Sequence, residues 1–331
     1  MTERNNVNPV VQQWNFTVEQ QFARNWMARA SYVGAQTHHQ IWYAHDINRP
    51  GVQQPNVPLQ AQRPYQPWQQ ILDTHTGGRV NFNQLQLELV KSFASGLSFQ
   101  AEYAFTRSLD NVPNSGGPQN PHNFDADYGN SRDVPRQQLV FNYLFTLPFG
   151  KGQRWMNRGG AQDAVLGGWG ISGITFYRTG TPFSIGFSVP SSIVGWWGGR
   201  ADAIAGANPH LPKTGSHDIV NGVRYINVSA FAPPAPWQWG NSAYNSLYGP
   251  GAWNYDIGIQ KYFPGPGAES HRLQFRTELL NALNHFNLGS PSATIADTRD
   301  GGLPNPSAGK IFGGSGYLNN RIVQLSTRYV F

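Results

Sequence analysis

The chain has 331 residues with no cysteine, 37 glycines and 24 prolines, and only 13% of its residues are charged. No run of about 20 apolar residues occurs, which excludes a helical membrane protein, and the lack of cysteine excludes a disulfide scaffold or a cysteine zinc site. The net charge of +6 comes from scattered basic residues, whereas a nucleic-acid-binding protein would concentrate them on one element, so we expect no nucleic-acid partner.

The start of the chain carries two segments in which apolar and polar residues alternate, which is the pattern of a strand with one apolar face. In the first, Trp14 and Phe16 alternate with polar neighbours; the second covers residues 26–33. The residues before them contain no apolar segment of the length of a signal-peptide core. We therefore expect the chain to be either cytosolic or a piece of an exported protein.

Nine segments along the chain alternate in this way, and most are about 9–12 residues long. Strands of soluble proteins have about 5–6 residues, whereas a tilted membrane-spanning strand needs about 9–11, and the aromatic residues near the segment ends resemble the girdles of outer-membrane barrels. The sequence predicts an all-β fold, an antiparallel meander of about nine long transmembrane strands forming part of an outer-membrane β-barrel; a soluble sandwich is the alternative. The segments are 11–20, 26–33, 81–91, 97–105, 136–147, 169–187, 253–263, 272–283 and 321–331.

The sixth segment is less regular than the others. Thr179-Gly180-Thr181-Pro182 interrupts its alternation, and we interpret these residues as a bulge or a bend. The sequence therefore predicts a departure from a clean strand at this point.

The connections alternate between short turns, at 21–25, 92–96, 148–168 and 264–271, and long loops, at 34–80, 106–135, 188–252 and 284–320. Outer-membrane barrels have short periplasmic turns and longer extracellular loops. The last strand is then expected to end in the periplasm, and the first to begin outside the cell. Because bacterial single-chain barrels have an even number of strands, an odd count predicts a chain cut within an extracellular loop.

Two clusters of polar residues have the residue types of a metal site. Asp125, Asp127 and Asp133, with Asn123 and Asn130, lack the glycine and the bidentate glutamate of a calcium loop, so we expect a solvated extracellular loop. His38, His39 and His45 lie in the first long loop, where their spacing is a weak match to a zinc site. No catalytic motif occurs, so we expect no enzyme and no cofactor.

The longest loop carries four tryptophans, which are Trp196, Trp197, Trp237 and Trp239. Exposed aromatic rings in a loop can stack on a flat ligand such as a sugar. The alternative is that they pack on one another or lie at the membrane interface.

The ordered set of sequence stretches resembles the C-terminal barrel part of the TonB-dependent outer-membrane receptors, and among them the Oar-like proteins that carry a carboxypeptidase-regulatory-like domain. The resemblance covers nearly the whole chain and rests on Asn8–Phe16, Ala30–Gly34, Phe82–Leu89, Leu97–Asp110, Leu147–Gly152, Leu166–Ile174, Gly249–Gly251 and Leu273–His285. It implies a 22-stranded barrel filled by an N-terminal plug and energised through TonB, which imports a ligand across the outer membrane. Residues 1–331 would be the C-terminal portion of that barrel, without the plug and the first strands, and so not competent alone.

The C-terminal residue carries a further implication of this kind. Phe331, with Tyr329, Leu325 and Val323 at alternating positions before it, resembles the signal read by the barrel-assembly machinery, although Thr327 is a polar departure. The expected partners are thus outer-membrane lipid, the assembly machinery, the TonB system through the absent plug, and an unidentified ligand. The other hypotheses are a small autonomous pore or structural barrel and a soluble β-rich binding module.

Overall fold

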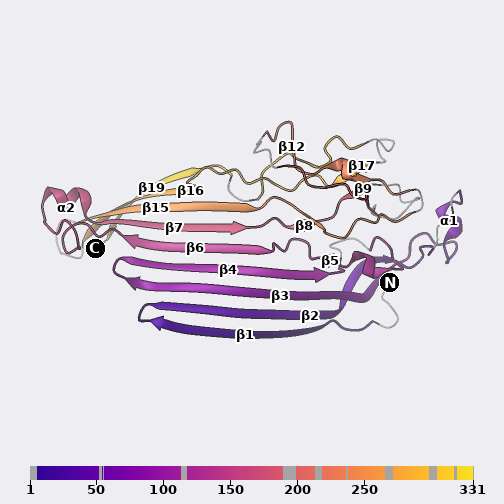
Figure 1. Ribbon diagram of the computed structural model, residues 1–331, viewed down its shortest axis with the longest axis horizontal. Coiled ribbons are helices and arrows are strands. Elements are labelled where there is room, and N and C mark those ends of the chain that lie inside the picture. The colour runs from indigo at the N-terminus through magenta and orange to yellow at the C-terminus, as the bar shows by residue number, and fades with distance from the viewer. Residues whose placement is uncertain are drawn as a thin grey trace.

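One antiparallel sheet dominates the computed structural model, which describes residues 6–51, 54, 56–112, 118–188, 199–212, 218–235, 238–264, 271–297, 304–316 and 319–330. Each long strand pairs with its neighbours in sequence (Figure 1), so the sheet is a meander, as predicted. Its nine long strands are β1 (Val10–Ala23), β2 (Trp26–Asp46), β3 (Leu72–Ala94), β4 (Leu97–Asp110), β6 (Gln137–Thr146), β7 (Trp169–Arg178), β15 (Ala252–Pro264), β16 (Arg272–Leu280) and β19 (Ile322–Val330). A two-residue strand, β5 (Gly129–Asn130), adds to β4.

The register places the apolar positions of successive strands side by side. Phe16 lies opposite Tyr32, and Tyr32 lies opposite Leu85 on its other side. Apolar side chains on this face are exposed: Phe16 is 69% exposed, and Leu325 on the last strand is 78% exposed. One face of the sheet is therefore mainly apolar, and we call it the outer face; the other is mainly polar.

Two strands are longer than the sequence predicts. Residues 34–46 and 72–80 were expected in a loop, but they belong to β2 and β3. The pairing of β2 with β3 shifts register three times between Thr37 and His45. Each irregularity breaks the two-residue period, so the alternation that reveals a strand is lost there.

Two strands also end earlier than expected. β7 stops at Arg178, and the chain then bends away from the sheet at the predicted interruption. β16 stops at Leu280, because Asn281 takes a left-handed conformation with φ of 50°. The Asn281 backbone N–H donates to Asp256 Oδ1 at 2.7 Å, which fixes the chain as it leaves the sheet.

The two ends of the sheet differ (Figure 1). At one end, called the turn end, two-residue connections join β1 to β2 and β3 to β4, and the helix α2 (Ala161–Leu166) follows β6. β1 begins at the opposite end, called the loop end, and β19 runs toward the turn end, as predicted. No helix among the described residues is both long and apolar enough to cross a membrane.

Ordered loops gather at the loop end, and we call their described residues in 47–71, 111–136, 179–251 and 281–321 the cap. The cap holds the helices α1 (Leu59–Gln62), η1 (Phe124–Asp127) and η2 (Val228–Ala230) and several short strands. Its apolar cluster consists of Ile185, Phe187, Ala201, Ile226, Leu247 and Ile295. The short strands are β8 (Pro182–Phe183), β9 (Gly186–Ser188), β10 (Gly199–Arg200), β11 (Asp202–Ala203), β12 (Val223–Arg224), β13 (Phe231–Ala232), β14 (Leu247–Tyr248), β17 (Thr294–Asp297) and β18 (Lys310–Ile311).

Candidate functional site

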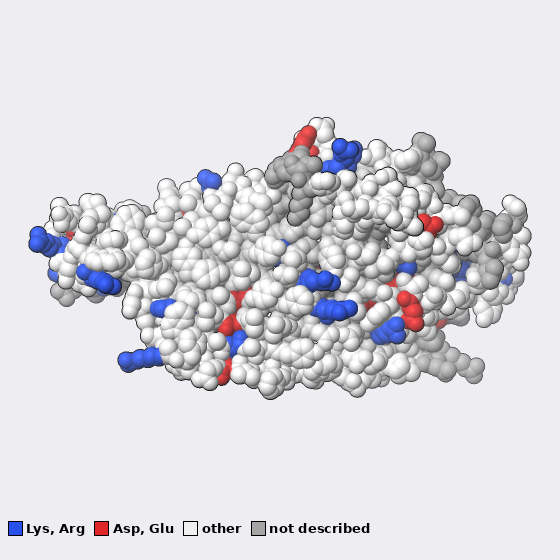
Figure 2. Space-filling view, in the orientation of Figure 1, with Lys and Arg blue, Asp and Glu red and all other residues white. Residues whose placement is uncertain are grey.

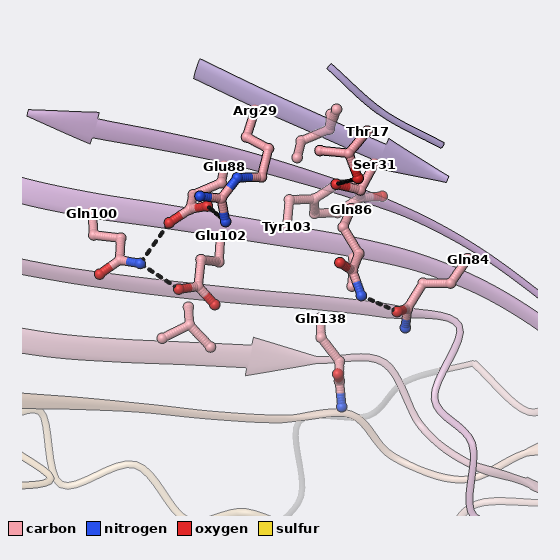
Figure 3. A pocket seen from close by; sticks show the side chains of 13 residues that line it. Thr17, Arg29, Ser31, Gln84, Gln86, Glu88, Gln100, Glu102, Tyr103 and Gln138 are labelled. Atoms are coloured by element: carbon pink, nitrogen blue, oxygen red, sulfur yellow. Dashed lines mark hydrogen bonds and ion pairs between the residues drawn. The ribbon is translucent and has the colours of Figure 1, made fainter. Parts of the chain in front are cut away.

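The polar face of the sheet contains a hollow of about 690 Å³ (Figure 3). Strands β1, β2, β3, β4 and β6 line it, because their polar residues alternate with the apolar residues of the outer face. The side chains around it are mainly hydroxyls, amides and carboxylates, which suit a water-filled lumen. Its polar lining includes Thr17, Arg29, Ser31, Gln84, Gln86, Glu88, Gln100, Glu102 and Gln138.

Charged groups from four strands meet in and beside this hollow. Arg29 bridges Glu19, at 2.8 Å from Nη2 to Oε2, and Glu88, at 2.9 Å from Nη1 to Oε2. Gln100 Nε2 donates to Glu88 Oε1 at 2.8 Å and to Glu102 Oε1 at 2.6 Å, as the dashed lines in Figure 3 show. Glu88 and Glu102 lie directly opposite each other on β3 and β4, a placement that is destabilising for like charges. With three carboxylates around one guanidinium, this part of the polar face is negatively charged.

A buried ion pair joins two loops of the cap. Asp127 of η1 contacts Arg200 of β10, and their side chains are 2% and 9% exposed. Arg200 also donates to two carbonyl oxygens, from Nε to Ser242 at 2.8 Å and from Nη2 to Ala126 at 2.8 Å. The pair is thus fully hydrogen-bonded, as a buried ion pair must be if it is not to destabilise the fold.

Gln119 completes this junction. Its backbone N–H donates to Asp127 Oδ2 at 2.8 Å, and its side-chain Nε2 donates to the Gly240 carbonyl at 3.0 Å. The ring of Tyr244 lies 5.8 Å from the guanidinium carbon of Arg200. Burial, together with the carboxylates of Asp110 and Asp127, raises the pKa of Tyr244 to about 12.

The expectation of a solvated acidic cluster is therefore wrong for Asp127. It holds for the other two carboxylates, since the Asp125 side chain is 73% exposed and that of Asp133 is 72% exposed. Asn123 is the N-cap of this 3₁₀ helix. The helix directs Asp127 inward, toward Arg200, which is 73 residues away in sequence. Among the described residues, no group of three or more histidines and carboxylates is placed to hold a metal ion.

His38, His39 and His45, which the sequence places in a loop, lie on β2, because β2 extends to Asp46. His38 and His39 are exposed, whereas His45 is partly buried. His45 Nδ1 lies 2.7 Å from Asp73 Oδ1, and its Nε2 lies 3.2 Å from the Pro121 carbonyl. His45 therefore links β2 to β3 and to the cap.

Of the four loop tryptophans, Trp239 is placed and Trp196, Trp197 and Trp237 lie outside the described residues. Trp239 packs against the apolar cluster of the cap. The guanidinium carbon of Arg49 lies 4.6 Å from the centre of its ring. Trp239 therefore has a packing role, while ligand contact by the loop tryptophans stays a prediction.

The C-terminal positions lie on the outer face of β19. Val323 pairs with Leu279, Leu325 with Thr277, and Tyr329 with Leu273. The Tyr329 hydroxyl and His271 Nδ1 form a hydrogen bond of 2.7 Å. Phe331 lies outside the described residues. Their reading by an assembly machinery stays a prediction.

Sequence reasoning missed two lysines on the outer face, Lys91 and Lys261. Lys91 Nζ donates to the carbonyls of Ala94 at 2.9 Å and Leu97 at 2.7 Å. Lys261 Nζ donates to the Gly167 carbonyl at 2.5 Å. A lysine that interrupts an apolar alternation near a strand end is the sequence signal that reveals such residues.

Comparison with known proteins identifies the class that this fold defines. The family described as outer membrane beta barrel domain matches residues 1–324, so the chain belongs to that family. Its location is accordingly the outer membrane. A comparison with curated protein sequences gives no match.

Solved structures similar to this chain are outer-membrane transporters and receptors. They include the outer membrane transporter YddB from Escherichia coli, with 12% identity, 99% of this chain and 33% of that chain covered, and a TM-score of 0.45. BauA, the ferric preacinetobactin receptor from Acinetobacter baumannii, has 10% identity over 97% of this chain and 29% of that chain, with a TM-score of 0.47. FpvA from P. aeruginosa, solved with bound pyoverdine, has 10% identity over 97% and 27%, with a TM-score of 0.48. The chain spans about a third or less of each of these proteins.

Proposed function

We propose that this chain forms part of a TonB-dependent outer-membrane receptor of the Oar-like type, whose parent protein imports an unidentified ligand. The nine strands supply part of the barrel wall, and the polar face lines its lumen. Because short turns of outer-membrane barrels are periplasmic, the cap faces outside the cell, where it would meet the ligand first.

The observation that carries this proposal is the pair of open sheet edges. β1 and β19 stand at the two ends of the strand order, and neither has a partner on its far side among the described residues. Each unpaired backbone group facing lipid costs several kcal/mol. These edges support a wall that is completed by further strands, and a chain that is not competent alone.

The cap supports the capture role. It is a folded layer with its own apolar cluster, so it can hold a binding surface in a fixed shape. Trp239 and Arg49 stack within it, and Trp196, Trp197 and Trp237 lie close in sequence to described residues of the same layer. We infer that these tryptophans contact the ligand.

Assembly tests the proposal. The chain alone is compared with the same chain extended by its upstream reading frame, which we expect to encode a signal peptide, a plug and the remaining strands. Only the longer product should give a heat-modifiable, protease-resistant barrel, and only it should bind the periplasmic domain of TonB. A heat-modifiable barrel formed by the chain alone, conducting ions in a planar bilayer, would instead establish a small autonomous pore. A detergent-free soluble monomer would establish a soluble binding module.

We also infer that Phe331, Tyr329, Leu325 and Val323 form the signal for the assembly machinery. Deleting Phe331 from the complete protein should lower its insertion in cells while leaving refolding into detergent unchanged. Equal losses in both assays would show that Phe331 acts only by anchoring its strand.

A further inference from the structure

The segment 148–168, which is the connection between β6 and β7 without its first residue, is far longer than the two-residue turns beside it at the same end of the sheet. It contains the short helix α2 and projects beyond the strands (Figure 1). We call it the 148–168 hairpin. A turn that only reverses the chain does not need this length, so the segment calls for another role.

The hairpin folds against the outer face of the sheet. Trp169 lies on that face, and its Nε1 donates to the Val165 carbonyl at 2.8 Å. Lys261, on the same face of β15, donates from Nζ to Val165 at 3.2 Å and to Gly167 at 2.5 Å. As a result Lys261 is only 6% exposed although it stands on the apolar side. The hairpin thus continues the surface that faces lipid.

The side chains at this junction are those of a membrane–water boundary. Lys261 Nζ lies 5.0 Å from the centre of the Trp169 ring and 4.8 Å from that of Phe263. Lys91 repeats the arrangement near the turn end of β3, with Nζ 5.9 Å from the centre of the Trp26 ring. Tryptophans and snorkelling lysines mark the headgroup level of a bilayer, so the hairpin begins at that level.

The exposed surface of the hairpin combines apolar and basic groups. Its open apolar side chains are Trp155, Met156, Val165 and Leu166, which are 50%, 52%, 64% and 41% exposed. Its cations are Lys151, Arg154 and Arg158, all exposed, and Figure 2 shows basic side chains at this end of the molecule.

The acidic groups do not neutralise these cations. Asp163 is the hairpin's one acidic residue, and its Oδ1 accepts a hydrogen bond from the Lys151 backbone N–H at 2.7 Å. The guanidinium carbon of Arg154 lies 5.4 Å from the centre of the Trp155 ring, so the charged and apolar groups are interleaved. Basic residues interleaved with tryptophan are typical of segments that lie in the interface of an anionic membrane.

We propose that the 148–168 hairpin is a membrane-anchoring foot, which inserts Trp155 and Met156 among the headgroups of the leaflet at the turn end and binds anionic phospholipid through Lys151, Arg154 and Arg158. Its continuity with the outer face and its excess of positive charge single out this partner. The inference rests on the outer-membrane location of the chain and is independent of which ligand its parent imports.

Single-cysteine labelling tests the insertion, because the chain has no native cysteine. A nitroxide is placed at Met156→Cys in the complete protein, with any cysteine outside these 331 residues replaced, after reconstitution into phosphatidylcholine vesicles containing phosphatidylglycerol. We expect relaxation by lipid-dissolved oxygen to exceed that by a water-soluble nickel complex. Val220→Cys, at a cap residue that is 86% exposed, should show the reverse, and Leu325→Cys reports insertion of the wall. Aqueous behaviour at position 156 alongside a lipid-exposed position 325 would overturn the proposal and point to a protein or cell-wall partner.

Lipid retention in detergent tests the charge and does not depend on reconstitution. Native mass spectrometry compares phosphatidylglycerol bound to the wild type and to the Lys151→Gln, Arg154→Gln, Arg158→Gln variant. Each basic residue near an anionic surface strengthens binding several-fold, so we expect a loss of roughly tenfold or more. The matched control removes three exposed cap arginines, Arg132, Arg224 and Arg321, and should retain the lipid. Equal retention by all three proteins would also overturn the proposal.

Discussion

The nine long strands, which we call the wall, differ from the cap in how they place apolar side chains. The wall exposes them, whereas the cap buries them. In the wall, Phe16 and Leu325 are 69% and 78% exposed, whereas in the cap Ile185 and Ile295 are 2% and 4% exposed. Ion pairs also differ between the two regions. The wall keeps Arg29 and Glu88 on its polar face, whereas the cap buries Asp127 against Arg200. The wall is therefore stable only with lipid around it, while the cap is held by exclusion of water, like a soluble domain.

The largest effect should come from the buried ion pair of the cap. Asp127→Ala leaves the Arg200 guanidinium buried without its carboxylate, which costs about 3–5 kcal/mol. Hydrogen exchange should accelerate in the cap and remain unchanged in the wall strands. Asp125→Ala, at a carboxylate that is 73% exposed beside Arg79, is the control, with a cost of about 0–1 kcal/mol. Equal acceleration in cap and wall would show that the two regions unfold as one unit.

The wall should be most sensitive on its outer face. Leu325→Arg puts a charge into lipid near the middle of β19 and should destabilise the complete protein by about 2–4 kcal/mol. Gln324→Arg is the control on the polar face, where the new arginine would lie opposite Glu278. Urea titration in phospholipid vesicles measures both. If Gln324→Arg proves the more harmful, the assignment of the two faces is wrong.

The pH dependence of the cap follows from Tyr244. Its pKa is raised to about 12 by burial and by the carboxylates of Asp110 and Asp127, so the folded cap keeps a proton that the unfolded chain loses near pH 10. The contribution of this group is therefore complete below about pH 10 and is lost as the pH rises toward 12, by up to about 2 kcal/mol. Tyr244→Phe should remove this loss of protection in alkaline hydrogen exchange. A variant that follows the same pH curve as the wild type would assign the effect to another group.

The smallest effect is expected at the hollow of the polar face. Arg29→Gln removes the cation between Glu19 and Glu88, but the Arg29 side chain is 42% exposed. Solvent screens such pairs, so we expect only a small loss of stability in urea titration. Arg24→Gln removes the same charge from the turn between β1 and β2 and should cost less still. A cost for Arg29→Gln as large as that for Asp127→Ala would mean that the polar face is packed like the cap.

The wall could be predicted from the sequence because its information is local. Alternation along residues 97–105 is enough to identify β4 and to assign its two faces. The prediction failed where register shifts break the period, between Thr37 and His45. It also failed at Leu280, where the left-handed Asn281 ends the strand in spite of a continuing apolar pattern.

The cap could not be predicted in the same way because its contacts join distant parts of the chain. Asp127 and Arg200 are separated by 73 residues, and His45 contacts Pro121 across 76 residues. No periodic pattern reports such pairs. The acidic cluster was thus interpreted as solvated, and the histidines were placed in a loop that is in fact a strand.

The lengths of β2 and β3 make the cap mechanically asymmetric. These strands have 21 and 23 residues, about twice what a bilayer crossing needs, and they run as one paired ribbon from the turn end into the cap. The connection 47–71 joins the ends of these two strands, so a displacement of its described residues requires the hydrogen-bonded pair of β2 and β3 to bend. On the opposite side, the chain leaves β7 at Thr179 and Gly180, where the long ladder stops. A paired ribbon therefore ties the cap to the sheet on one side, and the chain leaves the sheet without such a ribbon on the β7 side, so we expect the cap to rotate more easily about the β7 side.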